Sequence, residues 1–200
     1  MIVKTIPAGM LSANCYLMYD ETTKDALVLD PGGDQELIIR NIENLKLNIK
    51  AVLLTHGHMD HVGALKAIAD KYKVMTYINR LDTEVMKKGT SVYGSFPDID
   101  VTFIEDKEII NIANLQVQCI WTPGHTPGGM CFLVEDSLFS GDTLFQGSIG
   151  RTDFEGGDYD TIIRSIVNQL MILEDNVIVY PGHGPATTIL RERNYNPFIN

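Results

Sequence analysis

The sequence has no long hydrophobic run and comparatively little positive charge. No stretch approaches the roughly 18 consecutive apolar residues of a membrane-spanning helix, so we expect no membrane partner. Lysine and arginine together number 16 against 26 aspartates and glutamates, which gives a formal net charge of −10. Because a nucleic-acid backbone is bound by a basic face, this balance argues against a nucleic acid as partner.

Cysteine is also scarce. The three cysteines, Cys15, Cys119 and Cys131, are odd in number and form no C-x-x-C motif. This usage predicts reduced core residues in a cytoplasmic protein, and it gives no support to disulfides or a catalytic thiol. The start of the chain lacks a secretory signal, because its apolar run is short and is interrupted at Pro7.

The chain is long enough for one sizeable core and contains no linker or low-complexity tract. Its 200 residues are 44% hydrophobic, which predicts one globular domain over residues 1–200. Strands are expected over 15–19, 26–29, 51–54, 74–78, 101–104, 109–112, 115–121, 130–134, 137–139 and 177–180, with hairpins at 15–29 and 130–139. Helices are expected from an Asp34 cap to Leu45, over 62–72, and over 158–171. This order predicts an α/β (α+β) fold, with two packed sheets flanked by helices.

The histidines are concentrated at the ends of predicted strands. His56, His58 and His61 lie within six residues, and His125 and His183 each stand in a Pro-Gly-His motif. Asp142, in Ser-Gly-Asp, also follows an apolar strand. We expect all five histidines to lie on loops outside helices and strands, because loops at strand ends commonly carry functional residues.

These residue types predict a metal site. Packing His56, His58, Asp60 and His61 together without a cation would leave several polar groups unsatisfied. Histidine and aspartate without cysteine thiolates suit zinc, with iron or manganese as alternatives. Seven such ligands are too many for one tetrahedral ion, but they suit two ions that share a carboxylate and a water. Sites of that kind are usually catalytic, since the metals clamp both the attacking and the departing group.

The ordered set of ligands resembles the signature of the metallo-β-lactamase superfamily from about Asp30 to His183. The resemblance implies an αββα sandwich of two mixed sheets with the metals at one edge. It implies a first metal held by His56, His58 and His125. It implies a second metal held by Asp60, His61 and His183, with Asp142 as the bridge. Asp30 would support the ligand loop without touching a metal, although a plain turn residue is an equally good interpretation.

Within that superfamily, the stretch from Phe139 to Phe145 and the residues after it resemble glyoxalase II, the hydroxyacylglutathione hydrolases. Arg151 would then bind the peptide part of the thiol, the alternative being a surface arginine in an ion pair. Phe154 stands where some of those enzymes have a tyrosine, and it too is a candidate substrate-binding residue. Only residues 184–200 follow His183, with one short helix expected over 187–200. We therefore expect the shorter branch, without the helical C-terminal domain.

The expected reaction is hydrolysis of a 2-hydroxyacyl thioester such as S-lactoylglutathione. A hydroxide bridging the metals, oriented by Asp60, would attack the carbonyl carbon while the first metal polarises the carbonyl oxygen. A thioester suits this chemistry because a thiolate leaves without a strong general acid. With little chain after His183, we expect an open site that binds the thiol loosely.

Several other activities share these ligands. A lactonase or another esterase would use the same hydroxide, and a persulfide dioxygenase keeps the motif but binds one iron. A β-lactamase of the best-known type would have cysteine at Asp142, and a nuclease would need a basic groove. A non-enzymatic metal-binding module would show decayed ligands, and here every position is filled. The sequence leaves the physiological substrate, the metal and any homo-oligomer open.

Overall fold

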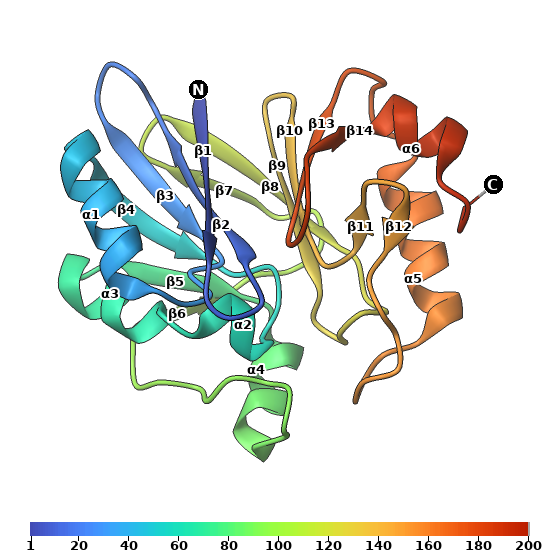
Figure 1. Cartoon of the computed structure of the whole chain (residues 1–200), viewed down its shortest axis with the longest axis horizontal. Helices are drawn as coiled ribbons and strands as arrows, with labels where there is room; N and C mark the ends of the chain where they lie inside the picture. The colour runs from blue at the N-terminus through green and yellow to red at the C-terminus, as the bar shows by residue number, and fades with distance from the viewer. Residues whose placement is uncertain (200) are drawn as a thin grey trace.

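The computed structural model describes residues 1–199 and contains two six-stranded sheets with helices on both outer faces (Figure 1). The first sheet has the spatial order β1 (Ile2–Ala8), β2 (Ala13–Tyr19), β3 (Asp25–Leu29), β4 (Asn48–Leu53), β5 (Met75–Ile78) and β6 (Val101–Phe103). The second has the order β14 (Thr187–Thr188), β13 (Ile178–Pro181), β10 (Ser137–Gly141), β9 (Met130–Val134), β8 (Leu115–Trp121) and β7 (Ile109–Ile112). Both sheets mix parallel and antiparallel pairs, which confirms the predicted αββα sandwich.

Three apolar layers hold the sandwich together. In β2, Cys15 and Leu17 point to the layer beneath α1 (Gln35–Leu45) and α3 (Leu65–Tyr72). Tyr16 and Met18 point to the layer between the sheets. This strand is buried on both faces because its side chains alternate between two cores. The third layer lies between the second sheet and a set of helical segments, α5 (Tyr159–Ser165), the π-helical η1 (Ile166–Leu170) and α6 (Ile189–Tyr195).

Most predicted elements are present, and the two predicted hairpins are antiparallel pairs, β2–β3 and β9–β10. The missed elements are β1, the helices α2 (Met59–Val62) and α4 (Arg80–Lys88), the two-residue strand β14, which occupies the start of the predicted final helix, and the small hairpin of β11 (Leu144–Phe145) and β12 (Ser148–Ile149). The edge strand β1 contains Pro7 and is half exposed, so it lacks a clear apolar pattern. In α4, Asp82 and Thr83 are among the buried residues, which obscures the apolar stripe.

Three local predictions were wrong. Asp34 precedes α1, but its side chain does not cap the helix and instead accepts the Gly9 N–H at 2.9 Å. His61 does not lie on a loop, since the short helix α2 (Met59–Val62) contains both Asp60 and His61. The third predicted helix does not stay α-helical to its end, because it continues from α5 into η1. The short final helix is α6, and Asn200, the last residue of that prediction, lies outside the described residues.

The cysteines lie where the sequence predicts them, and no membrane-spanning helix is found over residues 1–199. No helix in that range combines the length and apolar character needed to cross a membrane. Cys15, Cys119 and Cys131 are all free and buried. Burial raises the pKa of the Cys119 thiol to about 12 and that of Cys131 to about 11, so these thiols are core groups with little nucleophilic character.

Candidate metal centre

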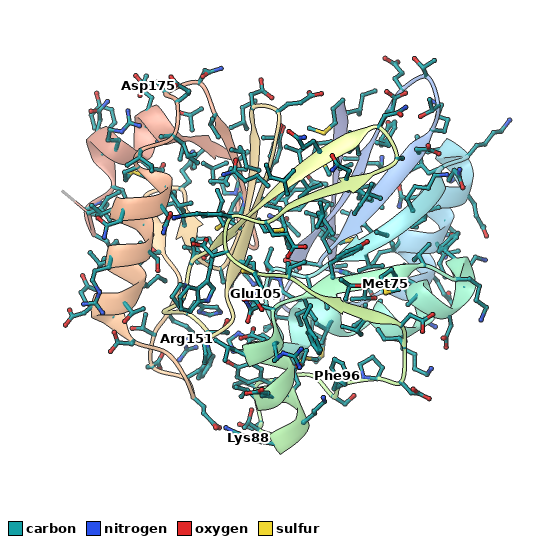
Figure 2. All side chains as sticks on the ribbon, turned by 180° about the vertical axis from the view of Figure 1, so that it is seen from behind. Met75, Lys88, Phe96, Glu105, Arg151 and Asp175 are labelled. Carbon is teal, nitrogen blue, oxygen red and sulfur yellow. The ribbon has the colours of Figure 1, made fainter. Side chains whose placement is uncertain are left out.

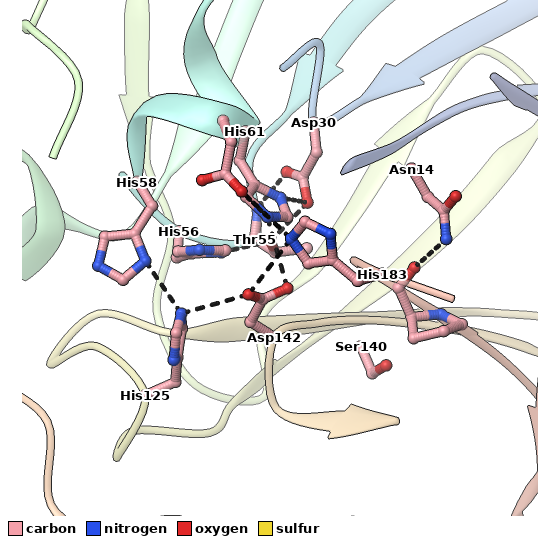
Figure 3. Close-up of polar contacts among 12 residues, drawn as sticks. Asn14, Asp30, Thr55, His56, His58, His61, His125, Ser140, Asp142 and His183 are labelled. Carbon is pink, nitrogen blue, oxygen red and sulfur yellow. Dashed lines mark hydrogen bonds and ion pairs between the residues drawn. The ribbon is translucent and has the colours of Figure 1, made fainter. Parts of the chain in front are cut away.

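The ends of strands from both sheets bring the candidate residues to one edge of the sandwich (Figure 3). Asp30 follows β3, and the stretch from His56 to His61 follows β4. His125 follows β8, Asp142 follows β10, and His183 follows β13. The structure therefore brings together all seven predicted ligands and Asp30, although they are spread over more than 150 residues of sequence, from Asp30 to His183.

His56, His58 and His125 form a first group, with donor nitrogens within 4.8 Å of one another. His58 Nδ1 and His125 Nε2 are 3.0 Å apart, a separation that requires a proton or a cation between two ring nitrogens. Burial and neighbouring histidines lower the pKa of His56 well below its ordinary value and that of His58 to about 3. Burial also lowers the pKa of His125. All three rings are therefore neutral, which is the form that binds metals.

Asp60, His61 and His183 form a second group of donors at the same spacing. His183 Nε2 lies 3.2 Å from Asp60 Oδ2, and this contact raises the pKa of His183. Burial alone would lower the pKa of His61, but Asp142 and Asp30 hold it well above its ordinary value. A group that stabilises protons on its imidazoles in this way attracts positive charge, and a divalent cation can replace those protons.

Asp142 lies between the two groups. Its Oδ2 is 3.5 Å from His125 Nε2 and 3.7 Å from His183 Nε2, and its Oδ1 is 3.4 Å from His61 Nε2. Burial by itself raises the pKa of Asp142, but the histidines, His61 foremost, hold it well below the ordinary range. One ionised carboxylate thus faces donors of both groups, as a bridging ligand would.

Several buried polar atoms in this cluster have no hydrogen-bond partner among the described residues. They include His56 Nε2, His61 Nε2 and Asp142 Oδ1. Leaving a buried polar group unsatisfied costs about 1–3 kcal/mol, so such atoms are rare in folded proteins. Neutral imidazole nitrogens and carboxylate oxygens are good ligands for divalent transition metals. The donor set therefore fits a metal ion in each of the two groups.

Asp30 and Thr55 orient the rings from behind. Asp30 Oδ1 accepts the Thr55 N–H at 2.8 Å, and Asp30 Oδ2 accepts the Thr55 hydroxyl at 2.6 Å and His61 Nδ1–H at 3.0 Å. His56 Nδ1–H donates to the same hydroxyl at 3.0 Å. With both Nδ1 atoms engaged as donors, Nε2 is the atom of each ring left to bind a metal, and His61 would give up its second proton on doing so. Asp30 thus lies behind the rings of His56 and His61, whereas the sequence reasoning missed Thr55, which directly precedes the first histidine.

Glycine allows the last ligand loop to approach the cluster. A Cβ on Gly182, which precedes His183, would lie 2.1 Å from Asp142 Oδ1 and 2.7 Å from His61 Cε1. No side chain fits there, so the glycine of this Pro-Gly-His motif is required by close contact.

A cavity of about 510 Å³ opens above the cluster. His58, Asp60, His125, Asp142 and His183 line one side of it. Its other walls include a set of apolar side chains, Leu11, Met59, Val92, Phe145 and Ile149. None of these five was predicted as a wall residue. Leu11 and Val92 come from the β1–β2 loop and the segment after α4, which only the fold brings to this place.

Arg151 and Phe154, the predicted substrate residues, also line the cavity. Figure 2 shows Arg151 toward the same end of the molecule as α4. Its guanidinium donates to Asp153 from Nε at 2.7 Å and from Nη2 at 2.6 Å, and it lies 3.8 Å from the centre of the Phe154 ring. The alternative interpretation, an arginine in an ion pair, thus describes this conformation. The Arg151 carbonyl additionally accepts His125 Nδ1–H at 2.7 Å.

Comparison with known proteins identifies the family. The model described as "Metallo-beta-lactamase superfamily" matches residues 8–183. The hydroxyacylglutathione hydrolase GloC of Haemophilus influenzae is 40% identical over 100% of this chain and 99% of its own length. The probable metallo-hydrolase YqgX of Bacillus subtilis is 35% identical over 98% of this chain and 97% of its own.

Solved structures agree over nearly the whole chain. The BLEG-1 B3 metallo-β-lactamase has a TM-score of 0.92 at 35% identity, covering 99% of both chains. TTHA1623, solved in a di-iron-bound form, has a TM-score of 0.85 at 32% identity, covering 98% of this chain and 99% of that one. ETHE1 from Myxococcus xanthus has a TM-score of 0.82 at 28% identity, covering 98% and 84%. The chain belongs to the metallo-β-lactamase superfamily.

Proposed function

We propose that this chain hydrolyses 2-hydroxyacyl thioesters such as S-lactoylglutathione with two divalent metal ions. The observation that carries the proposal is the position of the Asp142 carboxylate between two complete groups of three donors, at the floor of an open cavity. The 40% identity to a hydroxyacylglutathione hydrolase over the full chain supports the substrate class.

His56, His58 and His125 would hold the first ion, and Asp60, His61 and His183 the second, with Asp142 shared. Zinc is our first choice for both positions, because nitrogen and oxygen donors of this number suit it. Iron is the principal alternative, since a relative at 32% identity was solved with two iron ions. Bound here, the ions would supply an acidified water at neutral pH and positive charge for the carbonyl oxygen.

Asp60 is the residue best placed to handle the attacking water. Its side chain lines the cavity and remains partly exposed. Burial alone would raise its pKa, but the hydrogen bond to His183 and the charge of His61 lower it below the ordinary value. The Asp60 carboxylate is therefore ionised at neutral pH, and it can accept a hydrogen bond from water and orient it toward the substrate.

The charge state of the cavity favours a thioester. Asp60 and Asp142, the two carboxyl groups that line it, both have a lowered pKa, so neither carries a proton to donate at neutral pH. His183 also lines the cavity, and it would give up its extra proton on binding a metal ion. A departing amine or alkoxide needs such a proton, whereas a thiolate is stable without one because thiols are much more acidic.

The test is a comparison of substrates with the metal-loaded protein. Thiol release from S-lactoylglutathione is followed with a thiol-reactive dye, beside hydrolysis of lactones and of a β-lactam. We expect the thioester to give the largest kcat/KM, and Asp142→Ala to abolish most of that activity. Lactone or β-lactam cleavage faster by orders of magnitude would reject the proposal. So would oxygen uptake with glutathione persulfide by a one-iron protein, which is the reaction of a persulfide dioxygenase.

The cavity also bears on how the thiol is held. Arg151 is the one lysine or arginine among the described residues that line it. We propose that Arg151 binds a substrate carboxylate through a charge-assisted pair, while the apolar walls contribute little selectivity between thiols. Loose binding of the thiol part, with poor discrimination between thiol carriers, follows from this arrangement.

A further inference from the structure

Asp82 is a carboxylate that the proposed chemistry does not use, yet it is completely buried. It lies in α4 with 0% of its surface exposed. Its Oδ2 accepts the Gly57 N–H at 2.8 Å, and its Oδ1 accepts the Gly128 N–H at 2.6 Å. Burial raises the pKa of Asp82 to about 6 in spite of these hydrogen bonds. Burying an ionisable carboxyl group costs free energy of folding. Its presence here therefore indicates a structural or functional role for Asp82.

The two glycines belong to the two loops that carry the first donor group. Gly57 stands between His56 and His58, and Gly128 lies three residues after His125. These loops follow β4 of the first sheet and β8 of the second. One side chain therefore ties together two loops from opposite sheets, and those loops supply all three nitrogens of the group.

Close packing confirms that α4 presses against both loops. A Cβ on Gly57 would lie 2.8 Å from Met86 Cγ, and a Cβ on Gly128 would lie 2.7 Å from the Asp82 backbone nitrogen. Side chains at either position would push the helix away. The two glycines and Asp82 thus fix the distance from α4 to each loop.

The second donor group has no such tie to α4. His61 is held by Asp30, and no hydrogen bond joins Asp82 to Asp60, His61 or His183 within residues 1–199. Disturbing Asp82 should therefore affect the two groups unequally.

We propose that Asp82 is a positioning residue that sets the spacing of His56, His58 and His125 and thereby the affinity of that one metal position. The inference rests on the proposed metal-dependent function. It requires a carboxylate, because both oxygens must accept backbone N–H groups. An asparagine would keep the shape but place its NH₂ group against one of those donors.

The test is a metal titration of Asp82→Asn beside the parent and Asn79→Ala. Asn79 is a matched control, since it is buried and caps the same helix through the Leu81 N–H at 2.9 Å without touching either loop. Zinc binding to the metal-free proteins is measured in competition with a chromophoric chelator that resolves two binding steps. We expect Asp82→Asn to weaken one step by about tenfold to a hundredfold, the range typical for partners of metal ligands. The other binding step of Asp82→Asn should stay within about twofold of the parent, and so should both steps of Asn79→Ala. A tenfold to hundredfold weakening lies far above that margin.

Two outcomes would overturn the proposal. One is an Asp82→Asn variant that keeps both affinities, and the other is an equal loss of both steps. If the variant does not fold, amide exchange in the metal-free parent decides: slow exchange at Gly57 and Gly128 supports the role, and rapid exchange rejects it. A parent that binds two ions and shows this behaviour but cleaves no thioester would refute the proposed substrate and leave the role of Asp82 intact.

Discussion

At the scale of single residues, the Arg151 guanidinium has two competing partners, Asp153 and a substrate carboxylate. The guanidinium pairs with Asp153 and stacks on Phe154, while more than half of its side-chain surface is exposed. An exposed ion pair contributes little, because solvent screens it. The bidentate hydrogen bonds nevertheless lower the pKa of Asp153 to about 2. A substrate carboxylate must therefore compete with Asp153 for the guanidinium.

Replacing Arg151 by alanine should raise KM for a glutathione thioester by about tenfold to a hundredfold, from the roughly 1.5–3 kcal/mol of a hydrogen bond to a charged group. Metal content should stay intact, because it is the backbone carbonyl of Arg151 that orients His125. Asp153→Asn is the matched control, and by releasing the guanidinium it should leave KM unchanged or lower it. Steady-state kinetics with glutathione and smaller thiol carriers measure both variants. An unchanged KM in Arg151→Ala would remove this residue from the substrate site.

Sequence reasoning reached the seven donors because each stands in a short motif directly after an apolar strand. It did not reach Asp82, whose partners Gly57 and Gly128 are 25 and 46 residues away in the chain. Nor did it reach Leu11 or Val92 on the cavity wall. A ligand motif is local in sequence, whereas residues that support the ligands or line the cavity are defined by tertiary contacts. A single sequence holds no direct signal of those contacts.

At the scale of elements, α6 supports one wall of the cavity. Glu192, buried in this helix, accepts the Gly147 N–H at 2.7 Å and the Thr187 hydroxyl at 2.5 Å. Asn196 Nδ2 donates to the Ser148 carbonyl at 3.0 Å. Gly147 joins β11 to β12, and this hairpin contributes Phe145, Ser148 and Ile149 to the cavity. The short final helix therefore takes part in shaping the site.

Glu192→Ala should loosen that hairpin. Three donors would lose this acceptor: the Gly147 N–H, the Thr187 hydroxyl and the Asn196 side-chain amide. Each donor left unsatisfied in the interior would cost about 1–3 kcal/mol in the free energy of unfolding. We expect lower stability in denaturant and a higher KM for the thioester, with kcat and metal content close to those of the parent. Glu36→Ala, at a glutamate that is 83% exposed on α1, is the control. A variant that loses its metals as well would show that α6 supports the ligands themselves.

The predicted elements followed from clear patterns, and the missed ones had none. The β2–β3 and β9–β10 hairpins show apolar runs on both sides of a polar turn. By contrast, α4 buries polar residues, and β11 and β12 have two residues each, too short for any periodicity. Asp34 shows a further limit, since a residue that favours helix caps is used here to hold Gly9.

At the scale of the whole molecule, the sandwich delivers donors from two sheets to one edge. The first group takes histidines from after β4 and β8, and Asp142 follows β10 beside the second group. Neither sheet alone provides a complete centre. The two groups also differ in the pKa of their histidines. Burial lowers the pKa of the three histidines of the first group, whereas carboxylates raise the pKa of His61 and of His183 in the second. The layered fold was predictable from the order of elements and motifs. The opposite pKa shifts of the two donor groups were not, because they depend on distances between residues of different sheets.

The proposed metal centre holds one ion in each donor group, with Asp142 shared between them. Elemental analysis of the purified parent and of Asp142→Ala measures this occupancy. We predict two transition-metal ions per chain in the parent. In Asp142→Ala we predict loss of at least one ion together with most of the thioesterase activity, because the shared carboxylate faces both groups. One tightly bound iron in the parent, with the second group empty, would rule out a two-metal centre and favour a persulfide dioxygenase.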